Sequence, residues 1–119
     1  MCIVCLAMVC SQQKTCAECQ SKPQCGWCND ETETGTGKCV DGGATGPVIP
    51  ASCPAAERWS FLKCPLCQCN GHSKCVNGTN ICKECLGNTT GDECEECSNG
   101  FYGDAKNGGQ CSGKYDLIF

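Results

Sequence analysis

Cysteine content is the feature that most constrains this chain, because 18 of its 119 residues are cysteines. In a short chain such a density is typical of a disulfide scaffold. Leucine, isoleucine, valine and phenylalanine together number only 17, so buried apolar surface could not offset the backbone entropy lost on folding. The sequence therefore predicts a small disulfide-rich fold, in which each disulfide closing a loop of about 15 residues contributes roughly 3 kcal/mol.

Charge and location follow from the same composition. The formal net charge is −4 and no cluster of lysine or arginine occurs, so we expect neither a nucleic-acid partner nor direct membrane contact. Disulfides at this density persist only in an oxidising space, which predicts an extracellular protein, either secreted or the ectodomain of a single-pass membrane protein. Two Asn-x-Thr sequons predict N-glycosylation at Asn77 and Asn88.

Cysteine spacing divides the chain into two blocks, residues 10–64 and 65–111, flanked by unassigned tails at 1–9 and 112–119. In the first block we expect one short helix over Cys16–Ser21, short strands around Trp27 and over residues 59–62, and a Gly/Thr-rich turn over Thr34–Lys38. The second block reads as turns with short strands. The apolar stretch at residues 1–10 lacks a basic region and is short for a signal peptide. We therefore expect the chain to be part of a larger protein.

Zinc binding and redox chemistry are the alternatives to structural disulfides. Cys-x2-Cys pairs are typical zinc half-sites, but His72 is the sole histidine and Cys19 and Cys25 are too close together for separate half-sites. The run Cys25-Gly26-Trp27-Cys28 lacks the βαβ surroundings of a redox motif. The six pairs are Cys2/Cys5, Cys16/Cys19, Cys25/Cys28, Cys64/Cys67, Cys82/Cys85 and Cys94/Cys97. We favour disulfides, with no metal and no cofactor.

The remaining candidate residues favour structure over chemistry. A lone histidine with no carboxylate or serine partner does not make a catalytic site, so His72 is interpreted as a turn residue and the chain as a non-enzyme. The acids at 92, 93, 95 and 96 are interpreted as a solvated cluster, since no acidic calcium motif precedes Cys67. Trp27 is expected to pack over the disulfides, because small modules need every large apolar group for their cores, and Trp59 and Phe61 are expected in the core as well. Phe101 and Tyr102 are expected to cover the last loop of the second block.

The second block resembles a laminin-type EGF-like module. The resemblance rests on Cys67-Gln68-Cys69-Asn70-Gly71-His72-Ser73-Lys74-Cys75, Cys82-x2-Cys85, Thr90-Gly91-Asp92-x-Cys94-x2-Cys97 and Gly100-Phe101-Tyr102-Gly103. Spacing alone leaves 105 pairings open for eight cysteines. The resemblance implies the pairs Cys67–Cys75, Cys69–Cys82, Cys85–Cys94 and Cys97–Cys111.

The first block resembles a plexin-semaphorin-integrin (PSI) domain, a small cysteine knot. The motif is Cys16-x2-Cys19-x5-Cys25-Gly26-Trp27-Cys28, with one cysteine upstream and three downstream. The resemblance implies the pairs Cys10–Cys25, Cys16–Cys64, Cys19–Cys39 and Cys28–Cys53. Cys2 and Cys5 are left over.

The combination of the two blocks resembles the attractin and attractin-like family, with the multiple-EGF-like-domains proteins as the second choice. The resemblance rests on the runs Gly35-Thr36-Gly37-Lys38-Cys39, Gly46-Pro47-Val48 and Trp59-Ser60-Phe61, which lead into Cys64-Pro65-Leu66-Cys67. This implies a non-catalytic structural and interaction segment of an adhesion or receptor-like glycoprotein, working as a rigid spacer. Its partners would be neighbouring domains of the parent ectodomain and an extracellular protein ligand. An independent secreted protein-binding module is the alternative, and a zinc or redox protein the remote one.

Overall fold

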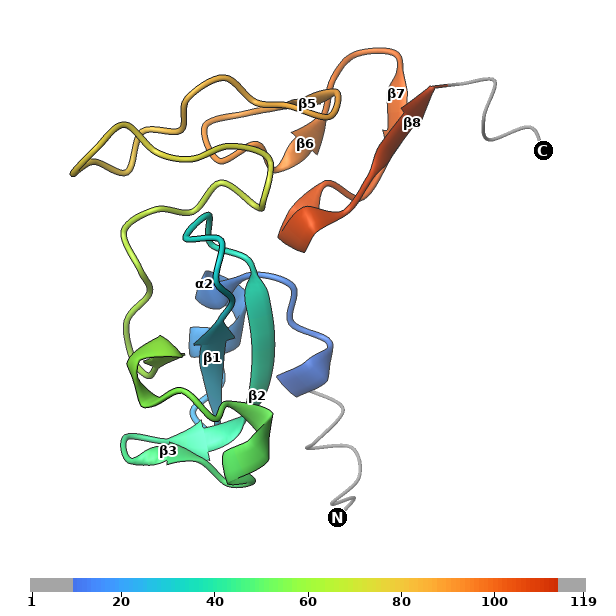
Figure 1. The fold of residues 1–119 in the computed structure, drawn as a ribbon. Helices are drawn as coiled ribbons and strands as arrows, with labels where there is room; N and C mark the ends of the chain where they lie inside the picture. Colours follow the sequence, from blue (N-terminus) through green and yellow to red (C-terminus); the bar gives the residue numbers. More distant parts are fainter. Residues whose placement is uncertain (1–9, 114–119) are drawn as a thin grey trace. The chain divides into compact units, whose positions relative to one another are not determined.

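The computed structural model describes residues 10–113, which divide into two compact units (Figure 1). The first unit takes residues 10–31 and 37–65, and the second takes 32–36 and 66–113. The second unit is thus discontinuous in sequence, since it includes Thr32–Thr36. Cys2, Cys5 and the tails at 1–9 and 114–119 lie outside the described residues.

Regular elements are short in both units. The first unit contains α2 (Cys16–Gln20), β1 (Cys25–Asn29), β2 (Gly37–Gly43), β3 (Gly46–Pro47), the 3-10 helices η1 (Pro50–Ser52) and η2 (Ala56–Arg58), and β4 (Trp59–Ser60). The second unit contains β5 (Thr89–Thr90), β6 (Glu96–Cys97), β7 (Phe101–Gly103), the 3-10 helix η3 (Lys106–Gly108) and β8 (Cys111–Gly113).

Helix α2 begins at a strong sequence signal. The Thr15 hydroxyl caps it by accepting from the Glu18 N–H at 3.2 Å, and the Glu18 carboxylate accepts from the Lys14 N–H at 3.0 Å. The first of these bonds satisfies an amide group that the first helical turn leaves without a partner. Cys16 and Cys19 are three residues apart, so both sulfurs lie on one face of the helix, and both residues are completely buried.

The first unit is built on a four-stranded antiparallel sheet with the order β3-β2-β1-β4. Trp27 lies opposite Cys39 on β2 and opposite Ser60 on β4. Its side chain is 0% exposed and is the largest of the fully buried side chains. The core around it consists of cysteines: Cys10, Cys16, Cys19, Cys25 and Cys39.

The segment that closes the first unit is held by polar side chains. The Asn29 side-chain amide donates to the Arg58 carbonyl at 3.0 Å and to the Ser60 hydroxyl at 2.9 Å. The Gln20 side chain donates to the Ser60 carbonyl at 2.8 Å and accepts from the Leu62 N–H at 2.7 Å. These bonds fasten η2 and β4 to β1 and α2, where few apolar side chains are available.

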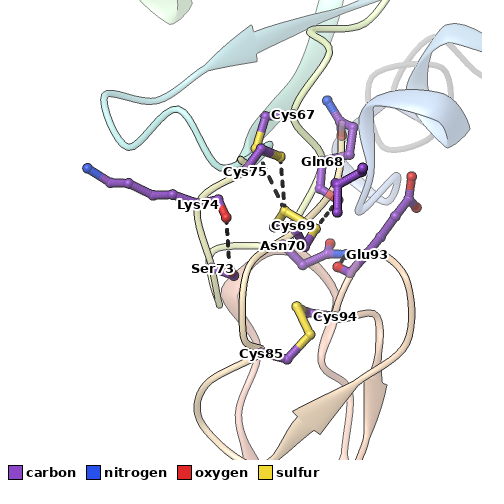
Figure 2. The surroundings of a disulfide bond; sticks show 12 residues. Cys67, Gln68, Cys69, Asn70, Ser73, Lys74, Cys75, Cys85, Glu93 and Cys94 are labelled. Carbon is purple, nitrogen blue, oxygen red and sulfur yellow. Dashed lines mark hydrogen bonds between the residues drawn. A yellow bond between two sulfur atoms is a disulfide. The ribbon is translucent and has the colours of Figure 1, made fainter. Parts of the chain in front are cut away.

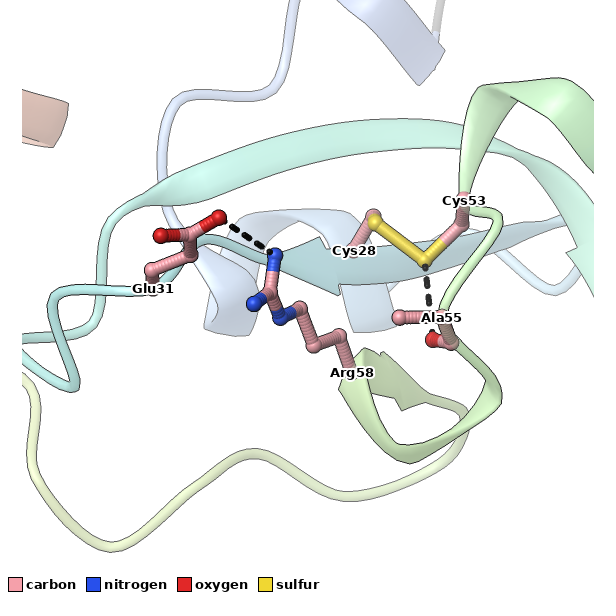
Figure 3. A network of polar contacts seen from close by, with 5 residues as sticks. All are labelled: Cys28, Glu31, Cys53, Ala55 and Arg58. Atoms are coloured by element: carbon pink, nitrogen blue, oxygen red, sulfur yellow. Dashed lines mark hydrogen bonds and ion pairs between the residues drawn. A yellow bond between two sulfur atoms is a disulfide. The ribbon is translucent and has the colours of Figure 1, made fainter.

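Figure 3 shows the cross-link beside this segment, the Cys28–Cys53 disulfide. One sulfur, that of Cys53, lies 3.9 Å from the Ala55 carbonyl oxygen. The Arg58 guanidinium lies 3.4 Å from the Glu31 carboxylate. Both of these charged side chains are solvent-accessible, so the ion pair contributes little to stability, and the disulfide is the stronger constraint.

The second unit has little regular structure. Strand β5 pairs with β6, β7 pairs with β8, and Cys75 and Cys82 form an isolated antiparallel bridge. Its well-buried apolar residues are three cysteines and one alanine: Cys69, Cys94, Cys111 and Ala105. Disulfides and backbone hydrogen bonds therefore stabilise this unit in place of the apolar core of a larger domain.

A small disulfide-rich fold of loops and short strands with a short helix is confirmed. The predicted helix is α2, and the strand expected around Trp27 is β1. The strand expected over residues 59–62 is β4, which ends at Ser60. The predicted turn over Thr34–Lys38 is too long, because Gly37 and Lys38 pair with Asn29 and Cys28 as the start of β2. The predicted unassigned tail begins too early, because Ser112 and Gly113 pair with β7.

Truncation of the buried indole tests how far the first unit depends on it. Trp27→Ala should lower the free energy of unfolding by about 3–5 kcal/mol, because it opens a cavity among the disulfides. Val48→Ala is the control, since this side chain is 73% exposed and should cost less than about 0.5 kcal/mol. Guanidinium unfolding with disulfides intact, followed by circular dichroism, measures both. Equal losses would contradict a core centred on Trp27.

Candidate functional site: the disulfide frame and the exposed sequons

All sixteen cysteines between residues 10 and 111 form disulfides. In the first unit the pairs are Cys10–Cys25, Cys16–Cys64, Cys19–Cys39 and Cys28–Cys53. In the second unit they are Cys67–Cys75, Cys69–Cys82, Cys85–Cys94 and Cys97–Cys111. Each of the two units therefore has four internal cross-links.

Two sulfur clusters have the proximity that a metal site needs but not the chemistry. The sulfurs of Cys67, Cys69 and Cys75 lie within 4.8 Å of one another, and another such group is formed by Cys10, Cys25 and Cys39. A metal takes the thiolate, and a disulfide sulfur offers none. Each cluster is the place where two disulfides lie side by side, as Figure 2 shows for the second unit, where the sulfurs of Cys69 and Cys75 are 3.3 Å apart.

Asn70 joins three loops of the second unit. Its side-chain amide donates to the Glu93 carbonyl at 2.9 Å (Figure 2), and its side-chain oxygen accepts from the Asn107 N–H at 2.9 Å. Its own carbonyl accepts from the Gly108 N–H at 2.8 Å. Asn70 is 7% exposed and adopts φ +54°, a conformation that asparagine tolerates better than most residues. The sequence alone does not indicate this role, although Asn70-Gly71 is a recognisable turn dipeptide.

His72 serves the same loop structurally. Its Nε2 lies 2.7 Å from the carbonyl oxygen of the buried Ala105. Because a carbonyl only accepts, Nε2 carries the proton. The His72 carbonyl in turn accepts from the Leu86 N–H at 3.0 Å. The histidine thus connects the Cys67–Cys75 loop to two other loops, which supports its interpretation as a turn residue.

The sequon at Asn77 lies on an exposed turn. The Thr79 N–H donates to the Val76 carbonyl at 2.9 Å, and Gly78 has φ +74°. The Thr79 hydroxyl donates to that same carbonyl at 2.7 Å and accepts from the Ile81 N–H at 3.1 Å. Asn77 itself is exposed.

The sequon at Asn88 leads into strand β5, which consists of its second and third residues. Asn88 and Thr90 are exposed, whereas Thr89 between them is buried and its hydroxyl donates to the Leu86 carbonyl at 2.5 Å. Asn88 has φ +63°, and its carbonyl accepts from the Ser98 N–H at 2.8 Å. The buried threonine anchors the strand while the two sequon side chains face solvent.

The acidic cluster and the aromatic residues of the second unit are at the surface. Asp92, Glu93 and Glu96 are exposed, as expected for a solvated cluster. Glu95 is half-buried instead, and its carboxylate accepts from the Glu93 N–H at 3.2 Å. Phe101 is half-buried, whereas Tyr102 is 48% exposed. Phe101 thus covers part of the module as expected, and Tyr102 does so less.

A protein-family model decides the nature of the second unit: the laminin/attractin EGF domain matches residues 67–111. These residues form a laminin/attractin EGF domain. The match covers all eight cysteines of the disulfide frame in the second unit. The resemblance inferred from the cysteine pattern is therefore confirmed for this part of the chain.

Curated relatives extend the similarity beyond the EGF domain. The chain is 48% identical over 114 residues to protein tag-53 of Caenorhabditis elegans, with 89% of the chain covered. It is 37% identical over 97 residues, 77% of the chain, to human multiple epidermal growth factor-like domains protein 8. Human laminin subunit alpha-3 is 49% identical over 47 residues, 39% of the chain.

The chain spans only 8%, 3% and 1% of the lengths of these three relatives. No solved structure gives a significant match. Within residues 10–113 no helix has the length and apolar character required to cross a bilayer. The homology to laminin EGF domains, which are extracellular, confirms the predicted extracellular location, and the EGF domain is an extracellular structural module.

Substitution of Asn70 tests whether polar bonds hold the laminin/attractin EGF domain together. Asn70→Ala should lower its stability by about 1–3 kcal/mol, since two partly buried hydrogen bonds to other loops are lost. Asn70→Gly separates the causes: glycine accepts a positive φ freely, so a similar loss would assign the effect to the side-chain bonds. Amide exchange at Asn107 reports the loss directly. Full stability in Asn70→Gly would instead assign the role of Asn70 to its backbone conformation.

Proposed function

We propose that this chain is a non-catalytic spacer and positioning segment of an extracellular receptor-like or adhesion glycoprotein. In this proposal residues 10–64 form a PSI-like domain and residues 65–111 a laminin-type EGF-like domain. The segment positions the neighbouring domains of its parent protein. Its stiffness lowers the entropy lost when a distant domain binds a protein ligand.

One observation carries this proposal. Between Cys10 and Cys111, every residue lies inside a loop closed by at least one disulfide, apart from residues 65–66, 83–84 and 95–96. A chain cross-linked so evenly resists extension and unfolding within each unit. Enzymes need chemically reactive side chains gathered in a cleft, whereas the sixteen cysteines from Cys10 to Cys111 are all held in disulfides.

The relatives support the assignment to a multidomain protein. Multiple epidermal growth factor-like domains protein 8 and laminin subunit alpha-3 are far longer than this chain. We further propose that glycans at Asn77 and Asn88 shield the second unit, because both asparagines are exposed. The absence of a lysine or arginine cluster gives no reason to add nucleic acid or membrane as a partner.

The second candidate function is an independent secreted protein-binding module. It is favoured by exposed apolar side chains on the second unit, since such side chains can serve as contacts for a partner. They are Leu66, Val76, Ile81 and Leu86, which are between 44% and 61% exposed. Binding of the purified chain to cell surfaces would favour this candidate, whereas a pure spacer should bind nothing.

Single-molecule pulling between residues 10 and 111 tests the spacer directly. With disulfides intact, the shortest covalent path has seventeen backbone steps and four disulfides, so extension should stop near roughly 80 Å at about 3.6 Å per step. After reduction the path has 101 backbone steps, and extension should reach about 360 Å. Equal extension before and after reduction would overturn the proposal.

Glycan occupancy is tested in secreted protein. Asn77→Gln and Asn88→Gln should each remove one glycan, seen as one step in electrophoretic mobility and in intact mass. Asn107→Gln is the control, because Asn107-Gly108-Gly109 is not a sequon. A mobility that neither sequon variant changes would show that neither site is used.

A further inference from the structure

The segment Thr32–Thr36 belongs to the second unit, although it precedes β2 of the first. The Thr34 carbonyl accepts a hydrogen bond from the Cys69 N–H at 2.6 Å. Thr34 is 5% exposed and Thr36 8% exposed. Such burial is unusual for threonines in a loop of a molecule this small, so the segment is packed rather than free in solvent.

The three threonines of this segment order it internally. The hydroxyl oxygens of Thr32 and Thr34 lie 2.6 Å apart, and those of Thr32 and Thr36 lie 3.0 Å apart. Since each hydroxyl has one proton and two lone pairs, these contacts provide polar partners for the buried side chains. Burial of Thr34 and Thr36 therefore leaves their hydroxyls satisfied.

Two glycines permit the close approach between this segment and the Cys67–Cys75 loop. A Cβ at Gly71 would lie 2.9 Å from the Thr36 methyl carbon, and a Cβ at Gly35 would lie 2.8 Å from the Gln68 Cα. Both distances are shorter than real Cβ contacts allow. The fit is thus matched from both sides, with a glycine on the segment and another on the loop.

We propose that Thr34–Thr36 is a structural segment of the laminin/attractin EGF domain and occupies a surface formed by residues 67–71. The domain in this protein is a composite, completed by a stretch of chain that lies outside residues 67–111. The bond from Thr34 to Cys69 holds the backbone where two disulfides lie side by side. This inference does not depend on the spacer function, and each can fail without the other.

Hydrogen exchange of the Cys69 amide in the complete chain tests the proposal. Gly71→Ala should accelerate this exchange at least about tenfold, because the new methyl group displaces Thr36 and opens the bond to Thr34. Gly78→Ala is the matched control: Gly78 has φ +74° against +83° at Gly71, but a Cβ there meets nothing within 4 Å. The backbone strain is alike in the two variants, and only Gly71→Ala adds the collision.

The segment can be tested from its own side with a second matched pair. Gly35→Ala should accelerate Cys69 exchange, whereas Gly100→Ala should not, because the two glycines have φ +95° and +89° and only Gly35 is crowded. Thr36→Ser, which removes the methyl group, should restore much of the protection lost in Gly71→Ala. This rescue distinguishes a specific collision from general misfolding.

Two results would overturn the proposal. One is exchange of the Cys69 amide at the rate of an unstructured peptide in the unmodified chain. The other is equal exchange in the crowded and uncrowded alanine variants of either pair.

Discussion

Covalent cross-linking between sulfur atoms is the constraint on which the rest of this structure depends. Among residues 10–113 few other large side chains are buried, and the one aromatic ring that is wholly enclosed there, that of Trp27, has cysteines around it. The disulfides act mainly on the unfolded chain, whose freedom they reduce. This is why strands of two or three residues, which would be unstable in isolation, persist in both units.

Hydrogen bonds supply the specificity that cross-links alone lack. A disulfide fixes the separation of two residues but leaves the loop between them many conformations. In the EGF domain, Asn70 and His72 reach from the Cys67–Cys75 loop to carbonyl and amide groups of other loops. In the first unit, Gln20 and Asn29 do the same for the segment around β4. The disulfides make each unit compact, and the hydrogen bonds of these side chains select one arrangement of its loops.

Much of the fold could be predicted from the sequence because cysteine density and local signals are independent of distant contacts. Thr15 and Glu18 mark the start of α2, and the family pattern after Cys67 identifies the EGF domain. The pairing of cysteines came from resemblance, since spacing left many pairings open. The roles of Asn70 and of Thr34 and Thr36 could not be predicted, because each depends on partners that only the folded chain brings near. The PSI-like character of the first unit stays a prediction.

The even distribution of disulfide loops has a consequence for a protein exposed to extracellular proteases. A single cut of the backbone at almost any point between Cys10 and Cys111 leaves the two pieces joined through at least one disulfide. Only cuts in the short stretches around residues 65–66, 83–84 and 95–96 separate them. Each of these stretches is bounded on both sides by a cysteine. The molecule therefore exposes very few places where one proteolytic event would break its continuity.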